Sequence, residues 1–299
     1  MAIKYILYNP NAGDPAAAKA IEDLRASYDT TVLINIRRIS SYETFFYGLE
    51  RDADVILCGG DGTLNHFIND ARGLSISHAL YYFPTGTGND FARDLGYGRF
   101  ARPVFRINEQ LKYLPQVTIN GESRLFLNNV GFGIDGYCCE EGDRLRAQNA
   151  GSPKPKPINY TQIAISGLLF HFQPRSATVT VDGKRYTFKQ VWLAPVMNGR
   201  YYGGGMMAAP GQDRMNKDGT VSLMLFHDLG KLRALAIFPS IFQGKHVTHK
   251  KNVTVLEGRE ITVTFDRPTP LQIDGETIPN VTSYAVSSRR AASEKGAAV

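Results

Sequence analysis

The chain has 299 residues, 43% of them hydrophobic, and a formal net charge of +6. This composition supplies a packed core and excludes extended disorder. The three cysteines lack metal-ligand and disulfide spacing, and no apolar run approaches the roughly 20 residues that span a bilayer. We therefore expect a cytoplasmic protein with one large or two medium domains, and its positive charge favours an anionic partner. Nucleic acid is not expected to be that partner, because the sequence carries no zinc finger or aromatic RNA-binding motif.

The first part of the chain alternates short apolar runs with segments of helical spacing. Strands are predicted at residues 4–9, 31–36, 54–58 and 79–83, and helices at residues 15–28, 42–49, 64–71 and 89–95. This alternation is typical of a parallel sheet covered by helices, with ligand-binding loops at the carboxyl ends of the strands. Residues 1–115 are therefore predicted to form a Rossmann-like α/β domain.

From about residue 115 the pattern changes to alternating apolar and polar residues with turn dipeptides. Asn120-Gly121 and Asp182-Gly183 are predicted hairpin turns, and helices are predicted at residues 160–171 and 231–242. An antiparallel β-sandwich is expected over residues 116–283. Residues 284–299 are expected to form a tail that either hangs free or returns to the first domain.

The strand at residues 54–58 runs directly into the sequence GGDGT, residues 59–63. Glycine-rich loops before a helix present backbone N–H groups that can hold a phosphate, and Asp61 would then require a cation such as Mg²⁺ between itself and the phosphates. In the alternative interpretation the glycines only permit a tight turn and Asp61 caps the helix.

Two similar loops follow other strands of the same predicted sheet. One is YNPNAG, residues 8–13, and the other is PTGTGND, residues 84–90, where Thr85, Thr87 and Asn89 add short polar side chains. Because the carboxyl ends of parallel strands lie at one edge, the three loops favour a shared ligand site over three unrelated turns.

Together these motifs resemble the diacylglycerol kinase catalytic family, which includes bacterial lipid kinases and the sphingosine and ceramide kinases. The likeness extends in order along nearly the whole chain. Its segments are YNPNAG (8–13), GGDGTLN (59–65), PTGTGNDFAR (84–93), NNVGFGIDG (128–136), YYGGGMMAAP (201–210), KDGTVSL (217–223), GKHV (244–247) and QIDGE (272–276).

The resemblance implies an ATP-dependent lipid kinase of phospholipid metabolism, with its active site in a cleft between an N-terminal nucleotide-binding domain and a β-sandwich domain. It implies Mg²⁺ at Asp61 and a second metal site formed by Asp218 with the backbone oxygens of Met215 and Thr220. The implied nucleotide-binding residues are Asn9, Pro10, Asn11, Ala12, Gly13, Ser40, Gly59, Gly60, Asp61, Gly62, Thr63, Leu64, Asn65, Thr87 and Asn89.

The acids of the QIDGE motif, Asp274 and Glu276, match the family residues that activate the acceptor hydroxyl. Phosphoryl transfer needs a proton acceptor within hydrogen-bond reach of that hydroxyl, and a carboxylate can serve. Which of the two acids takes the proton is left open. Asp135 is a further acid that either joins them or occupies a turn at a strand end.

A lipid kinase has to meet a membrane surface, which makes it a peripheral membrane protein. Residues 230–251 combine apolar residues with lysine and arginine, as surface helices that bind anionic headgroups do, but an ordinary helix packed on the sandwich gives the same pattern.

Several alternatives stay open at this stage. The GGDG motif is shared with NAD kinases, and the departures Asp14, His66 and Lys217 from the family pattern suit a homologue that binds nucleotide or lipid without turnover. The acceptor lipid is undetermined, and a homodimer is one open state of assembly.

Overall fold

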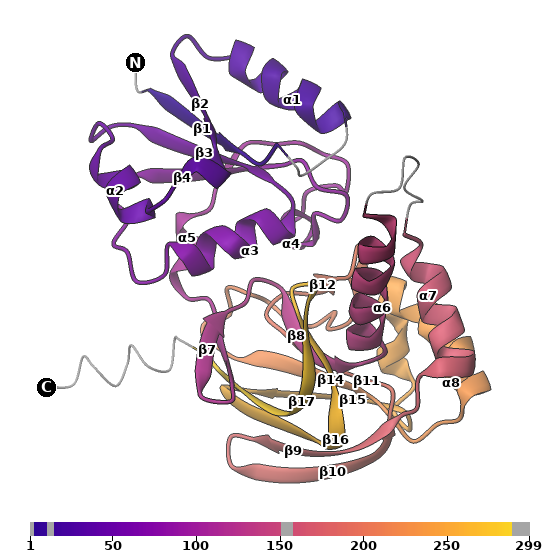
Figure 1. The fold of residues 1–299 in the computed structure, drawn as a ribbon. Coiled ribbons are helices and arrows are strands. Elements are labelled where there is room, and N and C mark those ends of the chain that lie inside the picture. The colour runs from indigo at the N-terminus through magenta and orange to yellow at the C-terminus, as the bar shows by residue number, and fades with distance from the viewer. Residues whose placement is uncertain (1–2, 11–14, 151–157, 289–299) are drawn as a thin grey trace, which may run out of the picture. The chain divides into compact units, whose positions relative to one another are not determined.

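The computed structural model describes residues 3–10, 15–150 and 158–288 (Figure 1). The chain divides into two compact units, Met1–Leu114 and Pro115–Val299. Within the described ranges, no helix combines the length and apolar character needed to cross a bilayer.

The first unit is built around a five-stranded sheet in the order β2-β1-β3-β4-β5. The first four strands are parallel, as predicted, and β5 adds an antiparallel edge that the sequence did not indicate. The strands are β1 (Lys4–Tyr8), β2 (Thr31–Asn35), β3 (Asp54–Gly59), β4 (Ala79–Pro84) and β5 (Phe105–Arg106). The helical segments are α1 (Pro15–Ala26), η1 (Ile36–Arg38), α2 (Tyr42–Tyr47), α3 (Asp61–Asp70), α4 (Asp90–Asp94) and α5 (Asn108–Lys112).

Alternate residues of the central strands pack on opposite faces of this sheet. Ile56 and Phe83 form a buried cluster with Ile21 of α1 on one face. On the other face the Tyr82 ring meets the Phe91 ring of α4 edge to face, with centroids 5.8 Å apart. Burial on both faces explains the nearly continuous apolar character of these strands.

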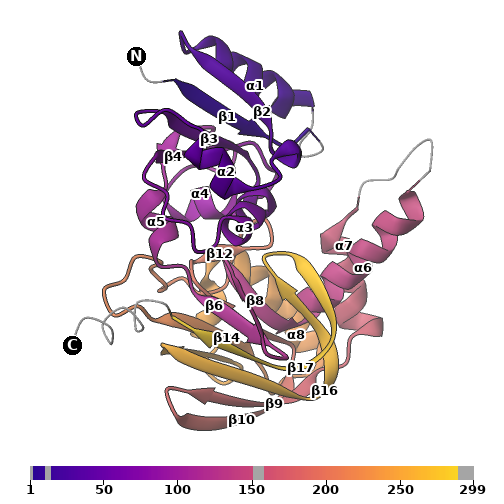
Figure 2. The same cartoon turned by 60° about the vertical axis from the view of Figure 1, so that its left-hand side comes forward.

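The second unit contains a ten-stranded antiparallel sheet (Figures 1 and 2). Its main path is β15-β14-β11-β8-β16-β17-β6-β7, and β9 pairs with both β16 and β10. The strands are β6 (Gln116–Ile119), β7 (Glu122–Leu125), β8 (Asn129–Gly133), β9 (Arg175–Val181), β10 (Lys184–Val191), β11 (Leu193–Met197), β14 (Val221–Phe226), β15 (Val253–Gly258), β16 (Glu260–Ile273) and β17 (Glu276–Ser287); β12 (Tyr201–Tyr202) and β13 (Met206–Met207) form a separate small hairpin.

The inner face of this sheet closes on a large apolar core that includes Phe132, Val263 and Tyr284. A second cluster, around Trp192 and Leu193, packs the outer face against a layer of helices. These are α6 (Ile134–Asn149), α7 (Tyr160–Ser166), η2 (Gly167–His171), α8 (Lys231–Ile237), η3 (Phe238–Gln243) and η4 (Lys245–Thr248). The fold class predicted from sequence, an α/β unit followed by a β-sandwich-like unit, is confirmed.

Both predicted hairpin turns are present. Asn120 and Gly121 connect β6 to β7, and Asp182 and Gly183 connect β9 to β10; all four have positive φ, as type I′ turns require. The helices predicted at residues 160–171 and 231–242 are also present.

Two predictions about this unit need correction. Residues 284–287, predicted to begin the tail, belong to β17, because Tyr284 and Val286 are buried in the core. The sixteen-residue helix α6 was not predicted, and it places Asp135 in a first helical turn rather than in a strand-end turn. The question of whether the tail returns to the first domain falls on residues 289–299, outside the described part of the chain.

Candidate functional site

The predicted phosphate-binding motif follows β3 directly. Gly60 is the N-cap of α3, and no side chain caps the first turn. The first N–H groups of a helix have no partner within it, and together with the helix dipole they favour an anion. The helix begins at Asp61 rather than at the predicted residue 64, so GGDGT forms both the loop and the first turn.

The loop after β4 lies against the β3 loop. The Thr85 N–H donates to the Gly59 carbonyl over 2.9 Å, and the Tyr82 hydroxyl donates to the same carbonyl over 2.9 Å. A Cβ built on Gly86 would stand 2.5 Å from the Gly60 Cα, so glycine is required for this close approach. We call residues 59–63 and 85–89 the glycine loops.

Asp61 holds the second of these loops in place. Its carboxylate accepts hydrogen bonds from the N–H groups of Asp90 and Phe91, each over 2.9 Å, at the start of α4. A carboxylate at a helix N-terminus is favoured by both the free N–H groups and the dipole. Asp61 therefore caps a helix, as the alternative interpretation expected, but this is α4 and not the helix in which Asp61 lies.

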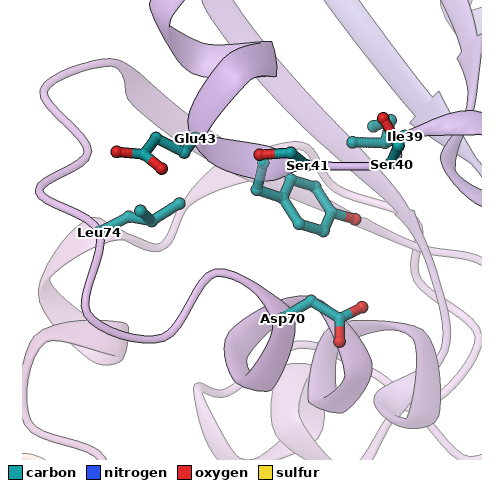
Figure 3. Close-up of a pocket in the computed structure, with 7 residues that line it drawn as sticks. Ile39, Ser40, Ser41, Glu43, Asp70 and Leu74 are labelled. Carbon is teal, nitrogen blue, oxygen red and sulfur yellow. The ribbon is translucent and has the colours of Figure 1, made fainter.

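Ser40 lies elsewhere in the first unit, in a cavity of about 480 Å³ (Figure 3). Glu43 and Asp70 also line this cavity, so it presents two carboxylates, and burial raises the pKa of the lining Tyr42 phenol. Its lining residues are Ile39, Ser40, Ser41, Tyr42, Glu43, Asp70 and Leu74, and none belongs to the glycine loops. Two carboxylates disfavour a phosphate in this cavity.

The β16–β17 turn carries both predicted catalytic acids. Asp274 and Gly275 have positive φ, and the Asp274 carboxylate accepts hydrogen bonds from the N–H groups of Leu127, Asn128 and Asn129; the bonds from Asn128 and Asn129 measure 2.7 Å and 2.9 Å. The Asp274 N–H donates in turn to the Asn129 carbonyl. Asp274 thus fastens the turn to the segment that enters β8.

A buried arginine supports the same segment from the other side. One terminal nitrogen of Arg214 donates to the Leu127 carbonyl over 3.3 Å and the other donates to the Asn128 side-chain oxygen over 3.0 Å. Residues 127–129 accept hydrogen bonds from the Arg214 guanidinium and donate other hydrogen bonds to the Asp274 carboxylate. The backbone of this segment is therefore fixed by both a cation and an anion.

Glu276 differs from Asp274 in its hydrogen-bond and ion-pair partners. The side chain of Glu276 is 38% exposed, and one carboxylate oxygen lies 3.2 Å from a terminal nitrogen of Arg124. An exposed ion pair of this kind contributes little to stability. Of the two acids, Asp274 is the one whose carboxylate holds the backbone of residues 127–129.

Helix α6 braces this turn through a buried relay. The Gln272 amide nitrogen donates to the Asp135 carboxylate over 3.1 Å, and the Gln272 amide oxygen accepts from the Gly275 N–H over 3.0 Å. Gly275 separates the two acids of the turn. Asp135 therefore acts on the turn through Gln272 and is a positioning residue in this arrangement.

Asp135 holds this position at an electrostatic cost. Burial raises the pKa of its carboxyl to about 6, although hydrogen bonds from the Gly136 N–H and the Gln272 amide oppose the shift. A buried carboxylate is retained at such a cost more often in functional sites than elsewhere.

Comparison with known proteins gives the family. Residues 4–113 match the model of the diacylglycerol kinase catalytic domain, and residues 128–289 match that of the YegS C-terminal NAD kinase beta sandwich-like domain. The chain belongs to the diacylglycerol kinase family. It is 26% identical over 253 residues to a Mycobacterium tuberculosis diacylglycerol kinase, and this alignment covers 81% of this chain and 78% of the relative. It is 24% identical over 291 residues to a Bacillus subtilis diacylglycerol kinase, and that alignment covers 91% of this chain and 88% of the relative.

A solved structure supports the same fold. The crystal structure of a diacylglycerol kinase from Bacillus anthracis aligns with a TM-score of 0.60 and 18% identity, over 96% of this chain and 94% of that one. The family predicted from the sequence motifs is confirmed. The predicted enzyme class is confirmed as well: this diacylglycerol kinase family member is a lipid kinase.

The structure places the nucleotide-binding residues predicted for this family member in different surroundings. Gly59, Gly60, Asp61 and the loop with Thr87 and Asn89 come together, whereas Ser40 lines the separate cavity. Leu64 and Asn65 are buried in α3, at 0% and 5% exposure, and present no side chain to a ligand. Asn9 and Pro10 follow β1 at the same edge of the sheet as the glycine loops, and Asn11, Ala12 and Gly13 lie outside the described residues.

The second metal site implied for this family stays a prediction, and one of its implied backbone oxygens already accepts hydrogen bonds. The Thr220 carbonyl oxygen already accepts from the amide nitrogens of Asn216 and Gln212, over 2.8 Å and 3.0 Å, and the Arg259 guanidinium donates to the Asp218 carbonyl over 2.7 Å. A carbonyl oxygen with two donors has both lone pairs engaged. The described residues also contain no cluster of three or more histidine, cysteine, aspartate or glutamate side chains suited to a metal.

Gly86→Ala tests the close approach of the glycine loops. We expect the variant to lose about 1–3 kcal/mol of unfolding free energy and to bind ATP more weakly, because the added methyl would collide with the Gly60 backbone. Urea denaturation and isothermal titration calorimetry with ATP would measure both effects. Gly62→Ala is the matched control for stability, since a Cβ there meets no heavy atom within 4 Å. Equal losses in both variants would contradict the explanation.

Proposed function

We propose that this chain transfers the γ-phosphoryl group of ATP to the hydroxyl group of a membrane lipid such as diacylglycerol. The observation that carries the proposal is the start of α3, which has no side-chain cap and lies against the second glycine loop. Family membership and the names of the relatives support a lipid as acceptor.

The glycine loops are proposed to bind the phosphates of ATP. Their backbone N–H groups offer fixed donors, and Asp61 keeps the second loop beside the first. Ser40 is proposed to act on the neutral end of the nucleotide, because the carboxylates of Glu43 and Asp70 beside it disfavour phosphate.

Mg²⁺ is proposed to accompany the nucleotide, where it would neutralise charge on the phosphates. Asp61 is the acid that would hold the Mg²⁺ ion. The oxygens of its carboxylate would then be shared between the ion and the two backbone N–H groups at the start of α4.

Glu276 is proposed as the general base that accepts the proton of the lipid hydroxyl. Its partial exposure supports this role, whereas the three N–H donors that surround the Asp274 carboxylate support an anchoring role for Asp274. The relay from Asp135 through Gln272 would fix the direction in which the turn presents Glu276.

A transfer assay with labelled ATP tests the proposal. The purified protein would be incubated with γ-³²P-ATP and Mg²⁺ in separate reactions with diacylglycerol, phosphatidylglycerol, a sphingoid base, a polyprenol and NAD. We expect label in the organic phase with at least one hydroxyl lipid, diacylglycerol first. Label only in NADP would favour an NAD kinase, and ATP binding without transfer to any acceptor would favour a homologue without turnover; either result would overturn the proposal.

A further inference from the structure

Large apolar side chains are exposed on one part of the second unit. Six large hydrophobic residues of its described segments are exposed, and five of them lie on the helices that cover the outer face of the sheet. They are Tyr160, Ile165, Phe170, Leu232 and Phe242, and we call this surface the α7–α8 face. Phe170 and Leu232 protrude most, at 74% and 79% exposure.

Phe170 and Leu232 come from neighbouring helices. Helix α8 packs against η2, and the Lys231 ammonium donates to the Leu169 carbonyl over 3.0 Å. This hydrogen bond joins the residues that directly precede Leu232 and Phe170. Figure 1 shows α8 near the lower end of α7, where η2 continues the chain and packs against α8.

The protruding side chains are not needed to attach these helices to the sheet. Leu168, Ala234 and Ile237 point inward and are buried in the cluster around Trp192. Each helix therefore has one apolar face that packs on the sandwich and further apolar residues in solvent. Ordinary packing explains the first face only, and exposed apolar side chains that lie together, as Phe170 and Leu232 do, mark an interaction site.

The charges of the same helices have one sign. Residues 158–173 contain no lysine, arginine, aspartate or glutamate, and residues 229–252 contain five lysines and arginines and no aspartate or glutamate. On the neighbouring helix α6, Glu141 pairs with Arg144 and Asp143 pairs with Arg146, Asp135 is buried, and Glu140 is an exposed acid. The face is thus apolar and basic, which complements a surface with negative charges above an apolar layer.

We infer that the α7–α8 face docks on anionic lipid bilayers, with Phe170 and Leu232 inserted at the headgroup boundary and the basic residues of α8 against the headgroups. The inference deepens the proposed function, because it names the membrane partner from which the lipid acceptor would be taken. Side chains that protrude from neighbouring helices enter a deformable bilayer surface without a matching groove, whereas a protein partner requires a complementary shape.

Vesicle sedimentation without ATP tests the inference separately from catalysis. The full chain would be mixed with vesicles of equimolar phosphatidylglycerol and phosphatidylcholine and with vesicles of phosphatidylcholine alone. We expect binding to the anionic vesicles that weakens with added salt, and a loss of at least about tenfold in the double variant Phe170→Ser/Leu232→Ser, because two exposed apolar side chains no longer enter the lipid. Arg233→Gln is expected to reduce binding about fivefold.

Matched controls separate this face from general stickiness. Tyr47→Ser/Phe100→Ser removes two aromatic residues of the first unit that are more exposed than Phe170 and Leu232, and this variant is expected to keep vesicle binding. Phosphorylation of a monomeric short-chain diacylglycerol should be unchanged in the Phe170/Leu232 variant, while phosphorylation of vesicle lipid falls.

Three results would overturn the inference. The first is undiminished vesicle binding by the Phe170/Leu232 variant, and the second is an equal loss of binding in the Tyr47/Phe100 control. The third is a change from dimer to monomer in the Phe170/Leu232 variant on size-exclusion chromatography while vesicle binding stays intact. That third result would identify a second copy of the chain as the occupant of the face. If the protein transfers phosphate to no lipid at all, the vesicle assay still reports whether the face binds membranes.

Discussion

Replacement of Glu276 by glutamine is expected to lower kcat for the lipid acceptor by about 100-fold or more while the protein stays folded and still binds ATP. General-base catalysis typically contributes factors of this size, and an amide of the same shape cannot take the proton. The side chain is 38% exposed and its ion pair with Arg124 is at the surface, so little stability is lost with the charge. Steady-state kinetics, circular dichroism and ATP titration would separate the three properties.

Asp274→Asn is the matched comparison two residues away. Its carboxylate accepts three backbone N–H groups, and an asparagine would turn a donor toward them. We expect a loss of about 2–3 kcal/mol in unfolding free energy, with a fall in activity that follows the loss of structure. If Asp274→Asn were fully stable and inactive while Glu276→Gln turned over normally, the two roles would have to be exchanged.

Patterns local in the sequence predicted most of the fold. The alternation of apolar runs with helical spacing located four parallel strands, and the dipeptides Asn120-Gly121 and Asp182-Gly183 located two hairpins, because positive φ at both turn positions favours these residues. Asp274-Gly275 has the same conformation, so the turn that carries the acids was readable as a hairpin without any knowledge of its chemistry.

Helix α6 was missed because its sequence has weak amphipathic character. Its polar residues include Glu141 with Arg144 and Asp143 with Arg146, two ion pairs at three-residue spacing that are a local helix signal. The segment also follows Gly133, whose positive φ of 131° turns the chain sharply out of β8. Charge spacing was therefore the one signal that would have predicted the helix.

The roles of individual acids depended on contacts between distant residues. Asp61 accepts from N–H groups 29 and 30 positions further along the chain, and Asp274 accepts from a segment about 145 positions earlier. A sequence shows which residues can donate and accept, but it does not show which pairs the folded backbone brings within 3 Å. The choice between Asp274 and Glu276 was open for this reason, and their different surroundings now favour Glu276 as the base.

Asp135→Asn is expected to abolish the fall in stability that burial of this carboxylate causes between about pH 4 and pH 6. The pKa of the Asp135 carboxyl is raised from 3.8 to about 6 by burial, so above pH 6 the folded state carries a buried charge that the unfolded state exposes to water. The native state then binds its proton more tightly than the unfolded state, and stability falls as the pH rises from about 4 to about 6. Removing the charge contributes up to about 3 kcal/mol to the unfolding free energy at neutral pH and nothing below about pH 4, while the donor that asparagine turns toward the Gly136 N–H or the Gln272 amide costs about 1–3 kcal/mol at every pH.

The same substitution is expected to lower kcat several-fold with little change in KM for ATP. An asparagine side chain at this position offers one acceptor oxygen in place of two, so the Gly136 N–H and the Gln272 amide compete for it, and the turn at Gly275 loses a fixed position. Asp143→Asn, on the exposed side of the same helix, is the matched control and should change the unfolding free energy by less than about 1 kcal/mol. Urea denaturation across the pH range, combined with kinetics, would test both effects. A variant whose stability no longer falls between pH 4 and pH 6 and whose kcat is reduced identifies Asp135 as a residue retained for function at the expense of stability; an unchanged pH profile or an unchanged kcat would contradict this.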